Sequence, residues 1–446
     1  MTVDPARRAG LRRICLALPT NRECVTPLEA ITEEASYAAT EFGVEVYLLV
    51  LDSCDRETFA QHAAVLRDTP RAPGVRVIHL DEAAQRRFLL RAIDHSGIAK
   101  PDRILDLMLP AKLSYGACTN RAFLIARALG CESIHRRDSD TSYQSANDAP
   151  VFPIHHELAA LGRPAAAAGD YVSQTQLAPQ HAQKPVVMAG GAIIGELTVD
   201  IAEIRDRDPE IYYDIVSLWA AEGTSEAEKR ALVDESFAGA GSETFTSDQS
   251  ILTIVDPMRV EMSNISFYRV QEEVPLPPGT DTIGTDYFLL HVIHDAALPG
   301  VLHNRHVVNY YTPERRTDDG FRAYQLRYVK FLLSMLYLHA IYRGLALAGE
   351  SMLDGNGLVR TSLLTDIVRD SIPLDWEPNV RRLEVLERSY RKLGGRYADF
   401  ADQLAGRHEE LLVDARSDIE DFAALIEVWA PLMRASEAVG ADQAWR

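Results

Sequence analysis

The first 140 residues alternate short apolar runs with segments whose apolar residues recur at helical spacing. Three of the runs, at 14–18, 44–52 and 75–80, are rich in Val, Leu and Ile, and a helical pattern follows each of them. Strands that alternate with helices in this way pair in parallel and are covered by helices on both faces. We therefore expect an α/β fold on a mostly parallel sheet, with ligands bound at the carboxyl ends of its strands.

The rest of the chain divides into a mixed stretch and a helical end. Residues 141–184 are rich in Gly, Pro, Ala, Ser and Gln, which indicates a long loop or a small insertion. Strand character returns at 185–201. Residues 202–250 are mostly helical and include a Gly/Ser-rich stretch at 238–248. The pattern is almost entirely helical from residue 321 onward. We expect one sheet-containing domain over residues 1–320 and an all-helical module over residues 321–446.

Charge and composition exclude several classes of protein. The chain carries 46 Lys and Arg against 65 Asp and Glu, a formal charge of −19, which argues against non-specific binding to nucleic acid or anionic membranes. The five cysteines form no CxxC pair, and their odd number favours reduced thiols. The apolar stretch 328–349 is interrupted by Lys330 and Arg343, which favours a buried helix over a membrane span. We expect a cytoplasmic protein without an integral membrane segment.

Polar motifs fall at the ends of predicted strands. PTNRE at 19–23 and LDSCD at 51–55 follow the first two runs, and RDSDTS at 137–142 follows a further strand that we expect directly before it. Two carboxylates one residue apart, Asp138 and Asp140, repel each other unless a cation lies between them. Their oxygens are suitable ligands for Mg²⁺ or Mn²⁺, which often takes substrate phosphates as further ligands. The alternative is an ordinary polar turn, because Asp and Ser bond readily to their own backbone.

These motifs occur in the order found at the front of GT-A glycosyltransferases, with the element Thr119–Arg121 between the second and third. The chain resembles the family-2-like enzymes of that group, and also an actinobacterial group of uncharacterised glycosyltransferase-like proteins. The resemblance covers about the first 145 residues well and residues 185–312 more loosely, and it excludes the helical module. LDSCD departs from the pattern, since it lacks the usual run of acidic residues.

The resemblance implies a role for each motif. The nucleoside of a nucleoside-diphosphate sugar would contact the first two motifs, and its phosphates or sugar would lie near Lys112 and the Thr119–Arg121 element. Asp138 and Asp140 would hold Mn²⁺ or Mg²⁺ on the diphosphate. The residues that it implies for donor binding are Pro19, Thr20, Asn21, Glu23, Asp52, Lys112, Asn120, Arg121 and Asp138.

In the second half, the resemblance implies a carboxylate that activates the acceptor, and Asp286 in IGTDYFLLHV has the expected position. An inverting enzyme would use it as the general base. The alternative is that Asp286 caps the helix that follows. A third metal ligand is expected near His303 and His306; we select His306, with Asn309 as a weaker candidate.

Several arginines have two interpretations. Arg305, Arg315 and Arg316 follow the predicted histidine ligands, and a guanidinium matches phosphate oxygens in a fork. They are diphosphate partners or solvated loop residues. Arg136 and Arg137 either compensate the charge of the acidic pair, or reach a phosphate, or face solvent.

The sequence thus predicts a metal-dependent glycosyltransferase that uses a nucleoside-diphosphate sugar and a small-molecule or peptide acceptor. A sugar nucleotidyltransferase is the first alternative, although LPTNRE lacks the glycines of its usual loop. A catalytically idle binding or scaffold protein is the second. In that case the C-terminal helices would mediate oligomerisation, for instance as a homodimer.

Overall fold

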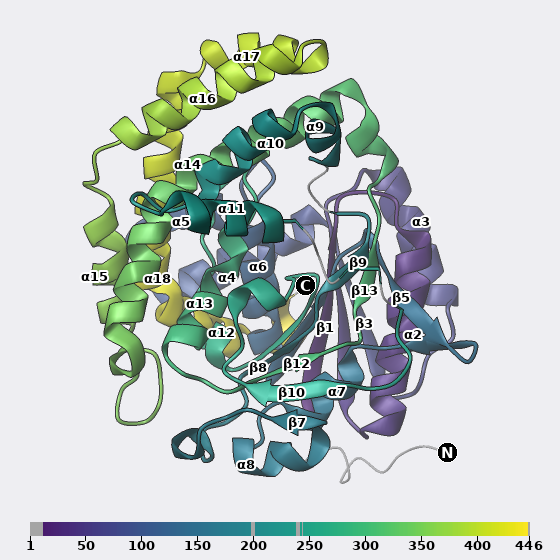
Figure 1. The fold of residues 1–446 in the computed structure, drawn as a ribbon. Coiled ribbons are helices and arrows are strands. Elements are labelled where there is room, and N and C mark those ends of the chain that lie inside the picture. Colours follow the sequence, from purple (N-terminus) through teal and green to yellow (C-terminus); the bar gives the residue numbers. More distant parts are fainter. Residues whose placement is uncertain (1–11, 198–200, 238–240, 243, 445–446) are drawn as a thin grey trace.

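The computed structural model describes residues 12–197, 201–237, 241–242 and 244–444. Its main sheet has nine strands in the order β3-β2-β1-β4-β11-β8-β12-β10-β7 (Figure 1). The first four in this order are mutually parallel. Strands β8 and β12 run in the same direction as these four, whereas β11, β10 and β7 run in the opposite one. The strands are β1 (Arg13–Thr20), β2 (Glu45–Asp52), β3 (Val75–Leu80), β4 (Ser133–Arg137), β7 (Gln174–Thr175), β8 (Met188–Gly190), β10 (Ser250–Thr253), β11 (Asn264–Tyr268) and β12 (Gly300–His303).

Helices cover both faces of this sheet (Figure 1). Alternate residues of β1 belong to two separate hydrophobic clusters, because successive side chains of a strand point to opposite faces. Cys15 and Ala17 pack with α4, α5, α6 and α18, whereas Ile14, Leu16 and Leu18 pack with α2, α3 and α7. The predicted fold class, a mostly parallel sheet covered on both faces, is confirmed. These helices are α2 (Val25–Glu41), α3 (Arg56–Asp68), α4 (Glu82–Ser96), α5 (Pro101–Met108), α6 (Tyr115–Ala128), α7 (Ile154–Ala160) and α18 (His408–Ala444).

A second sheet of four short strands lies beside the main one, in the order β6-β5-β13-β9. The prediction of a loop over 141–184 is wrong here, because this segment contributes a hairpin of β5 and β6, as well as α7, the short helix α8 (Ala165–Ala168) and β7. Asn147 and Asp148 connect the hairpin with φ values of 51° and 61°, the positive angles that a two-residue hairpin turn requires. The strands are β5 (Thr141–Ala146), β6 (Ala149–Val151), β9 (Ile193–Gly195) and β13 (Val307–Asn309).

The predicted strand segment 185–201 splits between the two sheets. Its first part is β8 of the main sheet, and its second part is β9 of the small sheet. Gly191 lies between them, and a Cβ atom there would be 2.7 Å from Asn264 Nδ2 and 2.9 Å from the His303 carbonyl oxygen. The backbone therefore approaches its neighbours closely at this glycine, where a side chain would not fit. Residues 198–200 of this segment, and residues 238–240 and 243 of the predicted Gly/Ser-rich stretch, lie outside the described residues.

The predicted helices of the second half are present. The segment Asp318–Met352, which contains α14, is long and apolar enough to cross a membrane by length and composition. Half of its most apolar window is buried inside the structure. The helices are α9 (Ala202–Arg207), α10 (Pro209–Val216), α11 (Glu226–Glu235), α12 (Val270–Glu273), α13 (Phe288–Asp295), α14 (Asp318–Ala348), α15 (Thr361–Ser371), α16 (Glu377–Leu393) and α17 (Arg396–Ala405).

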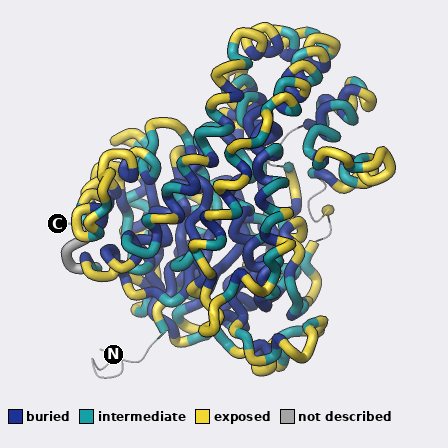
Figure 2. The backbone as a smooth tube through the Cα atoms, turned by 90° about the vertical axis from the view of Figure 1, so that its left-hand side faces the viewer, coloured by how far each residue is buried: buried dark blue, intermediate teal, exposed yellow. Residues whose placement is uncertain are grey.

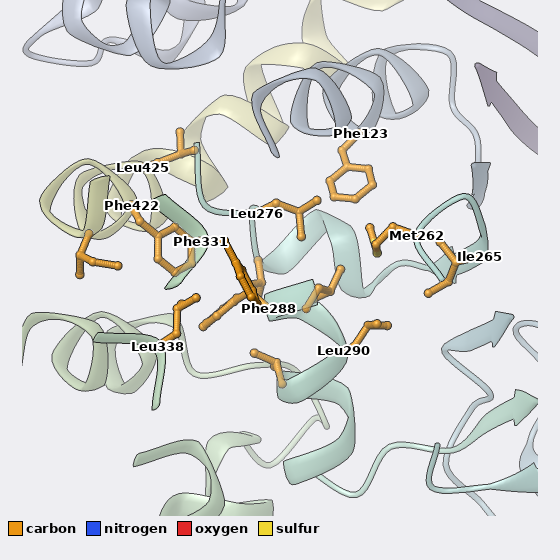
Figure 3. Packing of buried hydrophobic residues seen from close by; sticks show 14 of the residues in the cluster. Phe123, Met262, Ile265, Leu276, Phe288, Leu290, Phe331, Leu338, Phe422 and Leu425 are labelled. Atoms are coloured by element: carbon orange, nitrogen blue, oxygen red, sulfur yellow. The ribbon is translucent and has the colours of Figure 1, made fainter. Parts of the chain in front are cut away.

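The C-terminal helices share a hydrophobic core with the main sheet. Phe331 of α14 and Phe422 of α18 lie in one cluster with Phe288 of α13 and Phe123 of α6 (Figure 3). Buried segments run through the middle of the molecule, and exposed turns follow its outer helices (Figure 2). The division into domains at residue 320 stays a prediction.

Candidate active site

A cavity of about 1630 Å³ opens at the carboxyl ends of β1 and β4. The segment Pro19–Arg22 follows β1 and lines it, and Asp138–Asp140 does the same after β4. The cavity therefore lies where a ligand is expected, at the carboxyl ends of parallel strands. The residues selected from sequence that line this cavity are Pro19, Thr20, Asn21, Lys112, Arg121, Asp138, Asp140, Asp286 and His306.

Arg136 joins the acidic motif to Asp286. It is the next-to-last residue of β4 and is buried. Its Nη2 atom lies 3.1 Å from Asp138 Oδ1, and its Nη1 atom donates a hydrogen bond of 3.2 Å to Asp286 Oδ2. Burial opposes the charge of Arg136, but Asp138 and Asp286 outweigh this effect and raise its pKa. Carboxylates that are about 150 residues apart in sequence thus share one cation.

Asp140 has two cationic partners. Arg315 donates to its Oδ2 atom at 2.6 Å, and Arg22 donates to the same oxygen at 3.1 Å. Arg315 is therefore buried at the acidic motif and is not a solvated loop residue. The other two arginines have different partners: Arg305 binds Asp248, and Arg316 binds Glu196.

Some guanidinium groups of this cavity keep unused donors. The Nε atom of Arg136 and the Nε and Nη1 atoms of Arg315 are buried and have no hydrogen-bond partner among the described residues. A guanidinium has five N–H donors in a fixed fork, and leaving them unpaired away from water is costly. Such donors are suited to an anion with several oxygens.

Asp138 and Asp140 have the chemistry of a site for a hard divalent cation. Asp138 Oδ1 is buried without a hydrogen bond, although Arg136 lies close to it. Oxygen atoms of Asp138 and Asp140 are ligands that Mg²⁺ and Mn²⁺ accept, with water and phosphate completing the shell. Among the described residues, Asp138, Asp140 and His306 do not form a compact three-ligand group. A cation here would thus depend on ligands from the substrate.

His306, selected as the third ligand, lines the cavity, and its Nδ1 atom accepts a hydrogen bond from the Ala192 backbone N–H at 3.1 Å. Burial lowers its pKa. The neighbouring candidate His303 is buried, and neither of its ring nitrogens has a hydrogen-bond partner among the described residues. Asn309 bonds through its side chain to the Glu196 carbonyl oxygen.

Asp286 lies in the 3₁₀ turn Thr285–Tyr287 immediately before α13. Neither this turn nor α13 has a hydrogen bond from a capping side chain, so the alternative that Asp286 is a helix cap is wrong. Its carboxylate is buried and accepts from Arg136 instead. It therefore lies in the cavity with one oxygen bound to a cation.

Glu261 was not selected from sequence. It lines the cavity in the connection between β10 and β11, and the hydroxyl of Tyr287 donates to its carboxylate. Burial raises the pKa of Glu261 to about 7, and the charges of Asp286 and Asp138 act in the same direction. The local sequence, VEMSN, has no spacing that distinguishes this carboxylate from a surface one.

Three residues selected for donor binding lie outside the lining of the cavity: Glu23, Asp52 and Asn120. The Asp52 carboxylate is buried and accepts from His62 Nδ1 at 2.8 Å and from His79 Nε2 at 2.9 Å. Burial alone would raise the pKa of Asp52, but these hydrogen bonds hold it well below its usual range. Asp52, Cys54 and His62 also form a compact group of potential metal ligands.

The helix that carries Thr119–Arg121 is fixed from several sides. The Asn120 side chain donates to the carbonyl oxygen of Leu276 and accepts from its N–H, both at 2.8 Å. Arg121 donates to Gln85 Oε1 and to the Met108 carbonyl oxygen. These bonds position α6 against its neighbours, so the TNR element has a structural role irrespective of any ligand.

A model of the family described as "Family of unknown function (DUF6271)" matches residues 12–445. The chain belongs to the DUF6271 family. A comparison with curated proteins found no match.

Among solved structures, the chain has a match to the mannosyltransferase PcManGT from Pyrobaculum calidifontis in complex with GDP-Man and Mn²⁺. It has 13% identity and a TM-score of 0.34, and the match covers 94% of this chain and 88% of that one. TarS 1-349 from S. aureus has 12% identity and a TM-score of 0.27, covering 93% and 90%. The complex of TarS 1-349 with UDP-GlcNAc has 10% identity and a TM-score of 0.30, also covering 93% and 90%.

The raised pKa of Glu261 predicts a pH-dependent cost to stability. Between about pH 4.5 and 7 the unfolded chain loses a proton that folded Glu261 keeps, so the folded state becomes less stable as the pH rises. Glu261→Gln removes this pH-dependent loss of stability. From pH 4.5 to 8, its free energy of unfolding should therefore rise relative to that of the wild type by at most about 3 kcal/mol.

Urea unfolding at pH 4.5 and pH 8 measures this difference. Glu350→Gln is the control, because the hydrogen bond from Lys184 lowers the pKa of Glu350 on the protein surface. The control should show no such relative gain at high pH. A Glu261→Gln variant with the same pH dependence as the wild type would contradict the assignment.

Proposed function

We propose that this protein transfers a sugar from a nucleoside-diphosphate sugar to a hydroxyl group of an acceptor. The observation that carries the proposal is the set of unpaired, buried guanidinium donors of Arg136 and Arg315 beside Asp138 and Asp140. These groups lie in the cavity at the carboxyl ends of β1 and β4. Guanidinium donors match phosphate oxygens, and adjacent carboxylates match a divalent cation. A metal-bound diphosphate is the ligand that satisfies both.

The net charge of −19 makes this combination necessary. An anionic ligand approaching so acidic a protein needs local positive charge, which Arg22, Arg136 and Arg315 supply around the acidic motif. Mn²⁺ or Mg²⁺ bound by Asp138 and Asp140 would neutralise the charge of the leaving diphosphate. The nucleoside would lie against Pro19, Thr20 and Asn21.

Asp286 is the proposed general base. In transfer with inversion, it would accept the proton of the acceptor hydroxyl while that oxygen attacks the sugar. Arg136 orients the carboxylate through one oxygen, at 3.2 Å. The same arginine contacts Asp138, so it links the donor side of the cavity to the proposed base.

Calorimetric titration of UDP, GDP and dTDP, with and without Mn²⁺, tests the proposal. We expect at least one diphosphate to bind in a Mn²⁺-dependent way. Arg315→Met should weaken that binding about tenfold or more, because charged hydrogen bonds to phosphate are lost. Asp140→Ala should remove the dependence on Mn²⁺.

Arg316→Met is the matched control for Arg315→Met. Arg316 is the next residue, but it is exposed and pairs with Glu196 outside the cavity lining. Its substitution should leave nucleotide affinity unchanged. If none of the three diphosphates binds, or if Arg315→Met binds like the wild type, the proposed function is refuted. Equal binding with and without Mn²⁺ would refute the metal assignment alone.

A further inference from the structure

The cavity has a second region whose wall is aromatic, formed by Trp219, Phe237, Phe331 and Tyr342; we call these four residues the aromatic wall. The rings of Trp219 and Phe331 are 5.3 Å apart between centroids and meet edge to face at 72°. Trp219 and Phe237 are 5.7 Å apart. Tyr342 stacks on His291 with centroids 3.6 Å apart. Aromatic rings in such arrangements offer both faces and edges to a further ring.

One side of α14 supplies much of this region. Phe331, Met335, His339 and Tyr342 line the cavity and follow one another at intervals of three or four residues. Residues at this spacing lie on the same face of a helix. The C-terminal helical region therefore forms part of the cavity wall.

The aromatic wall begins next to the proposed base. A Cβ atom on Gly284 would lie 2.7 Å from a ring carbon of Phe331, so this ring rests on the backbone two residues before Asp286. Gly284 has φ of 72°, which also favours glycine. Burial raises the pKa of Tyr342, and the Asp286 charge adds to this effect because the two side chains are close.

The histidines beside the wall carry no charge at neutral pH. Burial lowers the pKa of His291 and of His339 to about 4 each. They therefore contribute neutral rings to this region. A flat uncharged ring packed against these side chains would contact aromatic and apolar groups, whereas a charged ring would lose its water there without gaining a partner from them.

We propose that the acceptor is an uncharged aromatic compound with a hydroxyl group, whose ring packs against Trp219, Phe331 and Tyr342 while its hydroxyl reaches Asp286. This inference rests on the proposed function and names the acceptor class. In the reaction the acceptor oxygen forms a bond to the anomeric carbon, and the bond from that carbon to the phosphate oxygen breaks. The proton goes to Asp286, and the nucleoside diphosphate leaves with the electron pair.

Calorimetric titration with 2-naphthol, without nucleotide or metal, tests this region by itself. We expect 2-naphthol to bind the wild-type protein, and methyl β-glucoside, which has hydroxyls but no aromatic ring, to show no binding. Trp219→Ala should weaken 2-naphthol binding about tenfold, since it removes one ring face and its buried area. Tyr342→Leu, which removes the ring but keeps an apolar side chain, should also weaken it.

Trp376→Ala is the matched control, because Trp376 packs on Arg416 outside the cavity lining. It should bind 2-naphthol like the wild type, and thermal unfolding should show that all variants are folded. The inference is overturned if the wild type does not bind 2-naphthol, or if both wall variants bind it unchanged. If nucleotide diphosphates bind but 2-naphthol does not, only the acceptor class is wrong. If 2-naphthol binds but no nucleotide does, the proposed function fails, and the acceptor role with it.

Discussion

Asp286→Asn should lower the rate of sugar transfer by about 10²- to 10⁴-fold, the usual contribution of a general base. Asparagine is nearly isosteric with aspartate and its oxygen still accepts the hydrogen bond from Arg136, but it cannot take a proton. Binding of the nucleoside diphosphate should therefore change little. The rate is measured as release of nucleoside diphosphate from the donor sugar, to water or to 2-naphthol, and the affinity by calorimetry.

Asp256→Asn is the control for this substitution. Asp256 also lines the cavity, but it is exposed and accepts a hydrogen bond from the Met258 backbone N–H, which asparagine can replace. It should retain the wild-type rate. An Asp286→Asn variant that turns over at the wild-type rate would leave Asp286 as an ion-pair partner of Arg136 and nothing more.

Arg137→Met should lower the free energy of unfolding by about 3–5 kcal/mol, as expected when one partner of a buried ion pair is removed. Arg137 is 1% exposed and donates to both oxygens of Glu34, at 2.8 and 3.1 Å, and to Glu157 at 3.0 Å. Both carboxylates are fully buried. Burial would raise the pKa of Glu157, but Arg137 and His135 lower it to about 2. Methionine would fill the space and leave two buried carboxylates without their shared cation.

Urea unfolding at pH 7 measures this loss. Arg316→Met again serves as the control, because the Arg316–Glu196 pair is 55% and 53% exposed on its two side chains. An exposed pair contributes about 0–1 kcal/mol, so the control should be close to the wild type. A loss below about 1 kcal/mol in Arg137→Met would show that the two glutamates are stable without the arginine.

Regular elements with a buried face could be predicted from sequence. The runs at 14–18 and 44–52 became β1 and β2, because a strand buried on both faces reads as a nearly continuous apolar run. The run at 75–80 became the edge strand β3. The hairpin of β5 and β6 was missed, since its short strands are largely polar and belong to a small sheet. Its Asn147-Asp148 turn was the one available signal.

The candidate site was predicted in outline only. Motifs at the ends of β1 and β4 meet at one cavity because parallel strands end at the same edge of a sheet. Glu261 was missed because its raised pKa depends on burial and on Asp286, which is distant in sequence. Asp52 is the last residue of β2, at the strand end as expected, yet its carboxylate accepts hydrogen bonds from His62 and His79. Such pairings depend on tertiary contacts, which leave no pattern in the local sequence.

The two adjacent arginines of β4 show which features the sequence determines and which only the tertiary structure determines. The sequence by itself predicted a strand that ends in an acidic pair, and left open what Arg136 and Arg137 contact. In the structure both belong to β4, where successive side chains point to opposite faces of the sheet. Only the tertiary structure decided what each face offers. Arg136 meets Asp138 and Asp286 in the cavity, whereas Arg137 meets Glu34 of α2 and Glu157 of α7 in the core. The reason is physical: a buried charge is stabilised by its partners in space, and these come from other elements of the fold.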